Sequence, residues 1–548
     1  MDYCLFFLKS FSYLMKTSRP RPWSHITSFI LLASTCCFAA ASADITTINI
    51  SIPAQPAQVD ARLYGQMLEH LNDKAVYDGI VNMDGTERPH VDALLKPLNI
   101  PVVRWPGGTI VHLYHWKNGI GPRASRRAAA STCIGGKESH KFGTDEFVQW
   151  CRRIGSEPYF NLNMANHPET AGTLQEALEW MEYVNGDAST EYGKLRAQNG
   201  HPEPYNVRYW GLGNENYEGW GKHNRETAQA YSERLHEWST AIRNRYPDLK
   251  LLAVGYHLDW DSVVLERCSS LIDYITQHYY VQTRIAEGKI TNAQNALFAS
   301  LRIEAHLAKV GELIETTSPA SSRANRPLKI SVDEWNNRHY VDEKLLRQDP
   351  RRQFDVAVTA TTLNAFIRQS QYVEMANYIF PVNAHGLIRT IGDNEAYETA
   401  IYEVFHQYRK WMVGEKMEAS VNGPGILPSE YRAAVQGDAG SEKAKIKASE
   451  GEPTFIDSSA VRGSDGAITV SIVNRSFDNP QKVHITAPDG YVVKSKWILE
   501  SQSPYAMNTP ESRDVVKARE EAITTSPTSV DIDILPTGLR LIRFEKAQ

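Results

Sequence analysis

Two glutamates that end runs of β-type residues could together cleave a glycosidic bond. Glu215 closes the run VRYWGLGNE, directly after Asn214, and Glu334 closes the run KISVDE. Cleavage of a glycoside needs two carboxyl groups, one protonated to donate to the leaving oxygen and one ionised to attack the anomeric carbon. Asn214 could hydrogen-bond a sugar hydroxyl, and desolvation by Tyr217 and Trp220 is expected to raise the pKa of Glu215.

The segments that must position these glutamates alternate between two periodicities. Between residues 62 and 416, short β-type runs are separated by longer segments with helical spacing. The β-type runs are YGQML, VVRW, PYFNLNM, VRYWGLG, KLLAVG, YITQHYY, KISVDE and MANYIFP. They predict an α/β fold, a (β/α)8 TIM barrel, with a doubly wound parallel sheet as the alternative. Because reactive groups stand at the C-terminal ends of barrel strands, we expect Glu215 on the fourth strand and Glu334 on the seventh to face each other.

The ends of the chain have a different character. Residues 417–548 carry short alternating runs between Gly, Pro, Asn and Asp, which predicts a C-terminal antiparallel β-sandwich. Residues 44–61 contain the strand-like ITTINISI, which needs a partner sheet and is expected to join the sandwich. Residues 1–43 combine early basic residues, an uncharged stretch and a final Ala-Ser-Ala, which predicts a signal peptide and a secreted or periplasmic protein. A membrane anchor is the alternative for this leader.

Composition limits the partners and cofactors of the chain. The 59 basic and 64 acidic side chains leave a net charge of −5, so no general field favours nucleic acid or an anionic membrane. Only Cys133, Cys151 and Cys268 follow the leader, which excludes a disulfide framework, and none belongs to a CxxC pair that would hold zinc. No metal and no cofactor is expected, because acid/base and covalent catalysis supply the chemistry.

An ordered set of motifs resembles the family 51 glycoside hydrolases, the α-L-arabinofuranosidases. These motifs are YGQMLEHL, LNIPVVRWPGG, NGIGPR, FGTDEFVQWCRRIGSEPY, EPYNVRYWGLGNE, ITQHYY and SVDEWN, followed by ITVSIVNRS and MNTPESRDVV in the C-terminal region. The resemblance implies a retaining two-step mechanism with Glu215 as acid/base and Glu334 as nucleophile, whose carboxyl groups should lie about 5–5.5 Å apart. It also implies a binding shell for the sugar, formed by Glu69, Arg104, Asn214, His278 and Tyr280.

The chain departs from the family pattern at two positions of this shell. Thr109 stands where an Asn is usual, and Asn377 stands where a Gln is common on the eighth strand. Two altered polar groups could mean a different sugar or linkage, because such a pocket discriminates through its hydrogen bonds. Trp335, like Trp105 and Trp220, is a candidate sugar platform, with packing in the core as the alternative for each. The arginines of residues 123–141 could contact an acidic polysaccharide, although a solvated loop is the simpler interpretation.

These observations predict a secreted retaining glycosidase that removes arabinofuranosyl residues from polysaccharides or oligosaccharides and that could form a homo-oligomer. An endo-acting glucanase or xylanase on the same barrel, or an exo-enzyme for another sugar, is the alternative. A non-catalytic glycan-binding protein is a third interpretation, since function resides in sites rather than folds. The presence of both Glu215 and Glu334 argues against it.

Overall fold

The computed structural model describes residues 45–70, 74–130, 136–217, 225–317, 327–426, 435–436, 453–523, 525 and 527–547. The predicted leader (residues 1–43), Cys133 and Trp220 lie outside these residues. Cys151 and Cys268 are buried free thiols. Within the described part of the chain, no helix has the length and apolar character needed to cross a bilayer.

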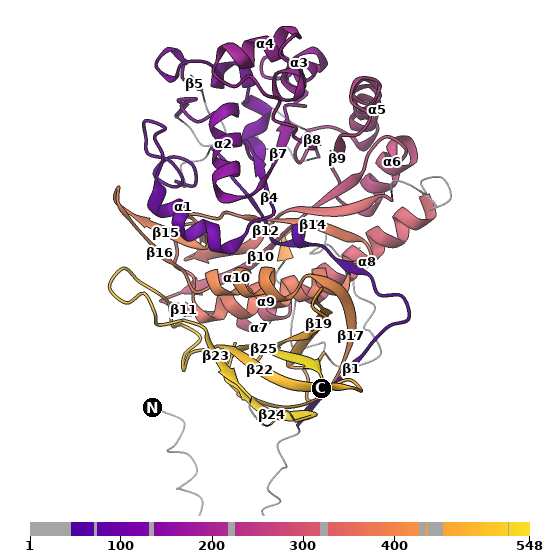
Figure 1. Cartoon of the computed structure of the whole chain (residues 1–548), viewed down its shortest axis with the longest axis vertical. Helices are drawn as coiled ribbons and strands as arrows, with labels where there is room; N and C mark the ends of the chain where they lie inside the picture. Colours follow the sequence, from indigo (N-terminus) through magenta and orange to yellow (C-terminus); the bar gives the residue numbers. More distant parts are fainter. Residues whose placement is uncertain are drawn as a thin grey trace, which may run out of the picture. The chain divides into compact units, whose positions relative to one another are not determined.

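Eight parallel strands form a closed barrel, and Figure 1 shows its labelled strands above those of the C-terminal sheet. They are β3 (Gly65–Met67), β4 (Val102–Trp105), β7 (Glu157–Leu162), β8 (Tyr209–Leu212), β9 (Lys250–Ala253), β10 (Tyr274–Ala286), β12 (Lys329–Val341) and β14 (Val373–Ile379). Each strand pairs in parallel with the next, and the pairing of β14 with β3 closes the ring. The predicted (β/α)8 barrel is confirmed, and closure excludes the doubly wound sheet.

Helices between the strands begin where the sequence supplies N-terminal caps. The described helices are α1 (Pro89–Leu95), α2 (Thr144–Ile154), α3 (Leu174–Asn185), α4 (Glu191–Gln198), α5 (Ala228–Arg245), α6 (Leu258–Cys268), α7 (Ala293–Leu297), α8 (Ser300–Thr317), α9 (Gln353–Arg368) and α10 (Tyr402–Trp411). The hydroxyls of Thr173, Thr190 and Thr227 each accept a hydrogen bond from a backbone amide in the first turn of α3, α4 and α5. Fifteen residues of α9 are buried, because this helix lies between the barrel and the C-terminal sheet.

The C-terminal sheet is curled around its own apolar core, which includes Ile48, Val470, Ile485 and Ile542. Its strand order is β23-β22-β25-β20-β19-β17-β1-β21-β24. These strands are β1 (Thr46–Ser51), β17 (Gly414–Asn422), β19 (Ile456–Arg462), β20 (Ile468–Asn474), β21 (Gln481–Thr486), β22 (Tyr491–Leu499), β23 (Arg519–Ala522), β24 (Ser529–Ile534) and β25 (Leu539–Lys546).

The N-terminal strand makes this sheet mixed rather than antiparallel. Strand β1 runs antiparallel to β17 but parallel to β21. The expectation of a purely antiparallel sandwich is therefore wrong at this pair. The physical reason is that the whole barrel separates β1 from β21 in the chain, so no hairpin turn forces the two strands to run in opposite directions.

Strands β10 and β12 are longer than the other barrel strands and extend beyond the mouth of the barrel. Their parallel pairing continues from Tyr280 opposite Asn336 to Ile285 opposite Val341. Short strands β11 (Lys289–Ile290) and β13 (Lys344–Leu345) fold back antiparallel on their ends. We call residues 280–286 and 336–341 the strand extension.

Candidate active site

Glu215 and Glu334 meet at the C-terminal ends of the barrel strands. Glu215 follows β8 in the left-handed backbone region, with φ of +44°, and Glu334 lies within β12. A carboxylate oxygen of each glutamate and a ring nitrogen of His278 all lie within 4.8 Å of one another. This spacing is near the ~5–5.5 Å of retaining glycosidases and shorter than the ~6.5–9.5 Å of inverting ones. A non-glycine residue at positive φ is uncommon and is found more often at functional sites.

The Glu334 carboxylate is held by charge and by a hydroxyl group. Arg104 Nη1 donates to Oε1 at 2.8 Å, and the Tyr280 hydroxyl donates to Oε2. The backbone of Gly108 passes so close that a Cβ on this residue would lie 2.6 Å from Glu334 Oε1. Only glycine leaves room for the carboxylate at this point.

Arg104 joins three barrel strands beneath the two glutamates. Besides Glu334, its Nη2 donates to Asn214 Oδ1 at 2.6 Å, and its Nε lies 3.2 Å from Asp333 Oδ2. Burial raises the pKa of Asp333, but the charge of Arg104 and the contact with His278 outweigh this effect and hold it below its usual range. Tyr159 also donates to Asp333, at 3.0 Å. The network therefore keeps a buried carboxylate ionised under the site.

His278 lies between the carboxylates. Its Nδ1 is 2.8 Å from Glu215 Oε1, and its Nε2 is 3.1 Å from Asp333 Oδ1. Burial lowers the pKa of His278, but the Glu334 charge and the hydrogen bonds to Asp333 and Glu215 together raise it to about 10. The imidazole is therefore protonated at neutral pH and donates from both nitrogens.

This imidazolium shifts the pKa of Glu215 in the direction opposite to the one expected. Burial does raise the pKa of the Glu215 carboxyl, but the hydrogen bond and the charge of His278 lower it below its usual value. The expectation that neighbouring aromatic rings raise this pKa is wrong for the free enzyme. Tyr217 stacks on Tyr256 with ring centroids 3.7 Å apart, while the cation nearest to Glu215 determines its ionisation.

Glu69 and Thr109 lie where the chain leaves β3 and β4. Glu69 Oε1 accepts a hydrogen bond from the Gly108 amide at 2.9 Å. Burial, followed by the charge of Glu334, raises the pKa of Glu69 to about 7. Thr109 is half-buried and begins the 3-10 helix Thr109–Leu113 directly after Gly108.

Comparison with known proteins agrees with this geometry. Residues 94–296 match the model described as "Alpha-L-arabinofuranosidase 1 domain", and residues 333–536 match "Alpha-L-arabinofuranosidase C-terminal domain". The "Probable alpha-L-arabinofuranosidase C" of Aspergillus flavus is 30% identical over 473 residues, which cover 82% of this chain and 88% of that protein. This chain belongs to the α-L-arabinofuranosidases of glycoside hydrolase family 51.

Solved structures extend the likeness over both parts of this family 51 chain. The α-L-arabinofuranosidase from Thermotoga maritima, solved as an arabinose complex, is 29% identical with a TM-score of 0.78 and covers 91% of this chain and 99% of its own. The GH51 α-L-arabinofuranosidase from Thermotoga petrophila is 28% identical with a TM-score of 0.76 and covers 92% and 100%. Like its family, this arabinofuranosidase is a retaining glycoside hydrolase, and its substrate is a carbohydrate.

Two residues expected in the arabinofuranosidase sugar pocket lie elsewhere. Trp335 is buried on the outer side of β12, with its ring against Phe366 and Tyr378. Successive side chains of a strand point to opposite faces, so Trp335 cannot share the face of Glu334. Asn377 is fully buried and donates from Nδ2 to the backbone oxygen of Gln66 at 2.9 Å, where β14 meets β3. Neither residue lines the site as expected. Trp105 is likewise buried, with its ring against Phe147 of α2 and Trp180 of α3.

The arginines of residues 123–141 serve the local structure of this arabinofuranosidase. Arg126 donates to Glu146 from Nη1 and Nη2 at 2.9 Å each, and its side chain is 3% exposed. Arg123 Nε also donates to Glu146, at 3.1 Å. Glu146 in turn accepts from the Gly143 amide at the start of α2, at 2.9 Å. These two arginines therefore share one largely buried carboxylate, whereas Arg127 is exposed, so a contact of this segment with acidic polysaccharide stays a prediction.

A metal would have to compete with His278 for the same carboxylates. Glu215, His278 and Glu334 offer three donor atoms within 4.8 Å, a spacing that a cation could use. However, a protonated imidazole has no lone pair for a metal, and His278 already donates to Glu215 and Asp333. The donor set of this arabinofuranosidase therefore fits an internal ion-pair network better than a metal site.

Sequence reasoning missed the supporting residues of the site. Asp333 precedes Glu334, and the alternation of a strand would place it on the opposite face, yet both carboxylates contact Arg104. The register between β12 and β14 is irregular from Val332 to Trp335, which explains how two successive acids reach the same cation. His112, whose Nε2 lies 2.6 Å from the Asn214 backbone oxygen, had no motif that could have identified it.

Proposed function

We propose that Glu334 is the nucleophile and Glu215 the acid/base of this α-L-arabinofuranosidase. The observation that carries the assignment is the approach of the two carboxylates to within 4.8 Å across the barrel mouth. In the first step Glu334 attacks the anomeric carbon, and the bond to the aglycone oxygen breaks as that oxygen receives a proton from Glu215. In the second step Glu215 takes a proton from water, whose oxygen displaces Glu334 and releases the sugar with retained configuration.

The environments of the two carboxylates suit these roles. Arg104 and Tyr280 stabilise the ionised form of Glu334, which must be negative to attack. Glu215 is paired with the protonated His278, so the pair holds one proton that can leave with the aglycone. We infer that His278 Nδ1 passes this proton to Glu215 as the aglycone oxygen develops negative charge.

Hydrolysis of aryl glycosides by the mature protein tests the proposal. We expect release of nitrophenol from the α-L-arabinofuranoside in preference to the β-D-xyloside, β-D-glucoside and β-D-galactofuranoside. Glu334→Gln should abolish turnover, and Glu215→Gln should lower kcat/KM about 10²–10⁴-fold. Glu157→Gln is the matched control, because Glu157 is the first residue of β7, at the other end of the barrel.

The outcomes separate the proposal from its alternatives. Full activity of Glu334→Gln would disprove the assigned nucleophile. Turnover of the xyloside or glucoside alone would favour an exo-enzyme for another sugar. If none of the aryl substrates is hydrolysed but a polysaccharide is cleaved, the result would favour an endo-enzyme.

We further propose that the natural substrates are arabinofuranosyl side chains of polysaccharides or oligosaccharides, and that the enzyme is exported. Export is supported by the signal pattern of residues 1–43. One relative, from Bacillus subtilis and 25% identical over 514 residues, is named "Intracellular exo-alpha-(1->5)-L-arabinofuranosidase 1". N-terminal sequencing of the protein from cell fractions tests export, with a start at Asp44 outside the cytoplasm as the expected result. An intact leader on cytoplasmic protein would overturn it.

A further inference from the structure

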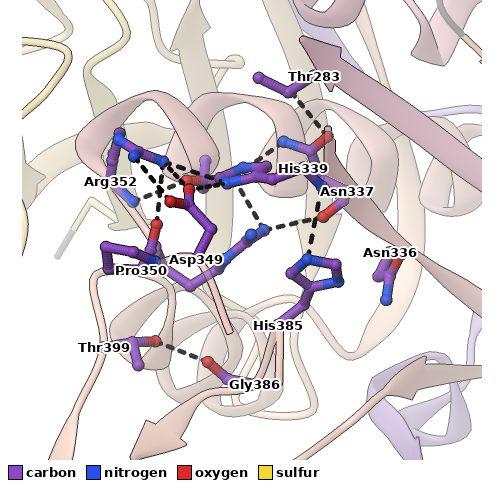
Figure 2. Close-up of polar contacts among 12 residues, drawn as sticks. Thr283, Asn336, Asn337, His339, Asp349, Pro350, Arg352, His385, Gly386 and Thr399 are labelled. Carbon is purple, nitrogen blue, oxygen red and sulfur yellow. Dashed lines mark hydrogen bonds and ion pairs between the residues drawn. The ribbon is translucent and has the colours of Figure 1, made fainter. Parts of the chain in front are cut away.

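The strand extension of β12 is anchored on one face by a buried polar network (Figure 2). His339 Nδ1 lies 2.5 Å from Asp349 Oδ2, and His339 Nε2 lies 2.7 Å from Asp355 Oδ1. Asn337, two residues earlier, donates to the same oxygen of Asp355 at 2.9 Å and accepts from Thr283 Oγ1 of β10 at 2.9 Å. Asn337 and His339 therefore hold β12 to the beginning of α9 and to β10.

This anchoring leaves the opposite face of β12 for the barrel mouth. Side chains alternate along a strand, so Arg338 shares the face of Glu334 and not that of Asn337 and His339. Its backbone lies four residues beyond Glu334, about 13 Å along the strand in the direction away from the barrel. In a retaining exo-enzyme the sugar that is cleaved occupies the space at the nucleophile, and the aglycone extends outward from it. Arg338 therefore lies on the aglycone side of the site.

The side chain of Arg338 turns back toward the catalytic groups. Its guanidinium carbon lies 3.3 Å from the ring centroid of Tyr280, whose hydroxyl donates to Glu334. Arg338 is half-buried, and after burial and His278 it is the next charge that influences the pKa of Glu215. Stacking on an aromatic ring fixes the plane of a guanidinium, and the N–H groups in that plane can bind a carboxylate through two parallel hydrogen bonds.

A second guanidinium acts on another carboxylate of the site. Arg347 is half-buried in the segment after β13, and its charge lowers the pKa of Glu69 against the larger, raising effects of burial and Glu334. Two residues later, Asp349 pairs with His339 and Arg352, so the same network fixes the segment that carries Arg347. Two guanidinium groups therefore influence the carboxylates of the site.

We propose that Arg338, stacked on Tyr280, binds a carboxylate on the aglycone, so that this enzyme prefers arabinofuranosides on chains that carry uronic acids. This inference rests on the proposed function and names its substrate class. A hydrogen-bonded ion pair at a half-buried position is stronger than a neutral hydrogen bond, which gives the preference its physical basis.

A matched pair of aryl α-L-arabinofuranosides tests the inference, one with a para-carboxylate on the phenyl ring and one with the corresponding methyl ester. We expect Arg338→Gln to lower the carboxylate-to-ester ratio of kcat/KM about tenfold relative to the wild type. The ratio of the wild type should fall with added salt, whereas that of Arg338→Gln should change little. Arg338 also influences the catalytic carboxylates, so its replacement can lower the activity on both substrates. The ratio of the two kcat/KM values cancels such a shared loss.

Arg284→Gln is the matched control. Arg284 lies further out on β10, with its guanidinium 5.9 Å from the ring centroid of Tyr340, and it forms an ion pair with Glu343. Its removal deletes the same charge from the same pair of strands, and the ratio should stay at the wild-type value. An unchanged ratio in Arg338→Gln, or an equal fall in Arg284→Gln, would overturn the inference. Failure of the wild type to hydrolyse the neutral ester would contradict the proposed function itself.

Discussion

At the scale of single residues, His278 and Glu215 compete for one proton. The imidazole donates to Glu215 at 2.8 Å and to Asp333 at 3.1 Å, and its pKa is raised to about 10 against the lowering effect of burial. Because the folded-state pKa exceeds the ordinary value of 6.5, the contribution of this residue to stability is fully present below pH 6.5 and is lost as the pH rises through about 10. The same shift keeps the pair protonated into the alkaline range.

Replacement of His278 by Gln should therefore move the alkaline limb of the kcat/KM profile to lower pH. Without the imidazolium, Glu215 must hold the proton alone, and a carboxyl loses its proton at lower pH than an imidazolium with a pKa of about 10. We expect kcat to fall about 100-fold as well, at the lower end of the usual range for acid/base catalysis. The control is His484→Gln, which removes an exposed histidine paired with Asp531 in the C-terminal sheet. An unchanged alkaline limb would show that His278 does not hold the catalytic proton.

At the scale of elements, the strand extension and the start of α9 depend on a single carboxylate. Asp355 Oδ1 accepts from His339, Asn337 and Arg351, and its Oδ2 accepts from the Arg352 amide. Burial raises the pKa of Asp355, but Arg351 and His339 hold it well below its usual range. Its contribution to stability is therefore present above the ordinary pKa of 3.8 and is lost only as the pH falls toward strongly acidic values.

Asp355→Ala should lower the free energy of unfolding by about 3–5 kcal/mol, because it leaves buried cations without a counter-charge. Urea denaturation at pH 7 measures this loss. Asp342→Asn is the control, since Asp342 is an exposed carboxyl immediately after β12. A loss no larger than that of the control would mean that the network contributes little to the stability of the extension.

At the scale of the whole molecule, the two ends of the described chain meet in one sheet. Strand β1 lies between β17 and β21, so its removal would divide the sheet and expose the edges of both neighbours. The sheet also supports the barrel through α9, where Asn364 Nδ2 donates to Asp457 at 2.8 Å and Ser459 donates to Asn364 at 2.7 Å. Loss of β1 should therefore affect both parts of the molecule.

A chain that begins at residue 61 should consequently melt at least about 10 °C below a chain that begins at Asp44, or fail to fold. Calorimetry of the two proteins measures the difference, and the longer chain serves as the control. Equal melting temperatures would show that β1 is dispensable and that the barrel is stable without an intact C-terminal sheet.

The sequence by itself determined the barrel, the change of character after it and two glutamates at the ends of β-type runs. These features are local, because strand and helix periodicities and the position of an acid at the end of a β-type run can be read within a few residues. The orientation of Trp335 could also be predicted from the sequence, since the alternation of side chains along a strand places it on the face opposite Glu334. Its buried packing against Phe366 follows directly from that alternation.

Only the tertiary structure decided how distant residues act on one another. Closure of the barrel sets the spacing of Glu215 and Glu334, and it places His278 between them, which lowers rather than raises the pKa of Glu215. The parallel pairing of β1 with β21 and the stacking of Arg338 on Tyr280 likewise depend on contacts between separate elements. The physical reason is that electrostatic interactions and strand pairing depend on distance in space, whereas sequence patterns report only the chain's own periodicity.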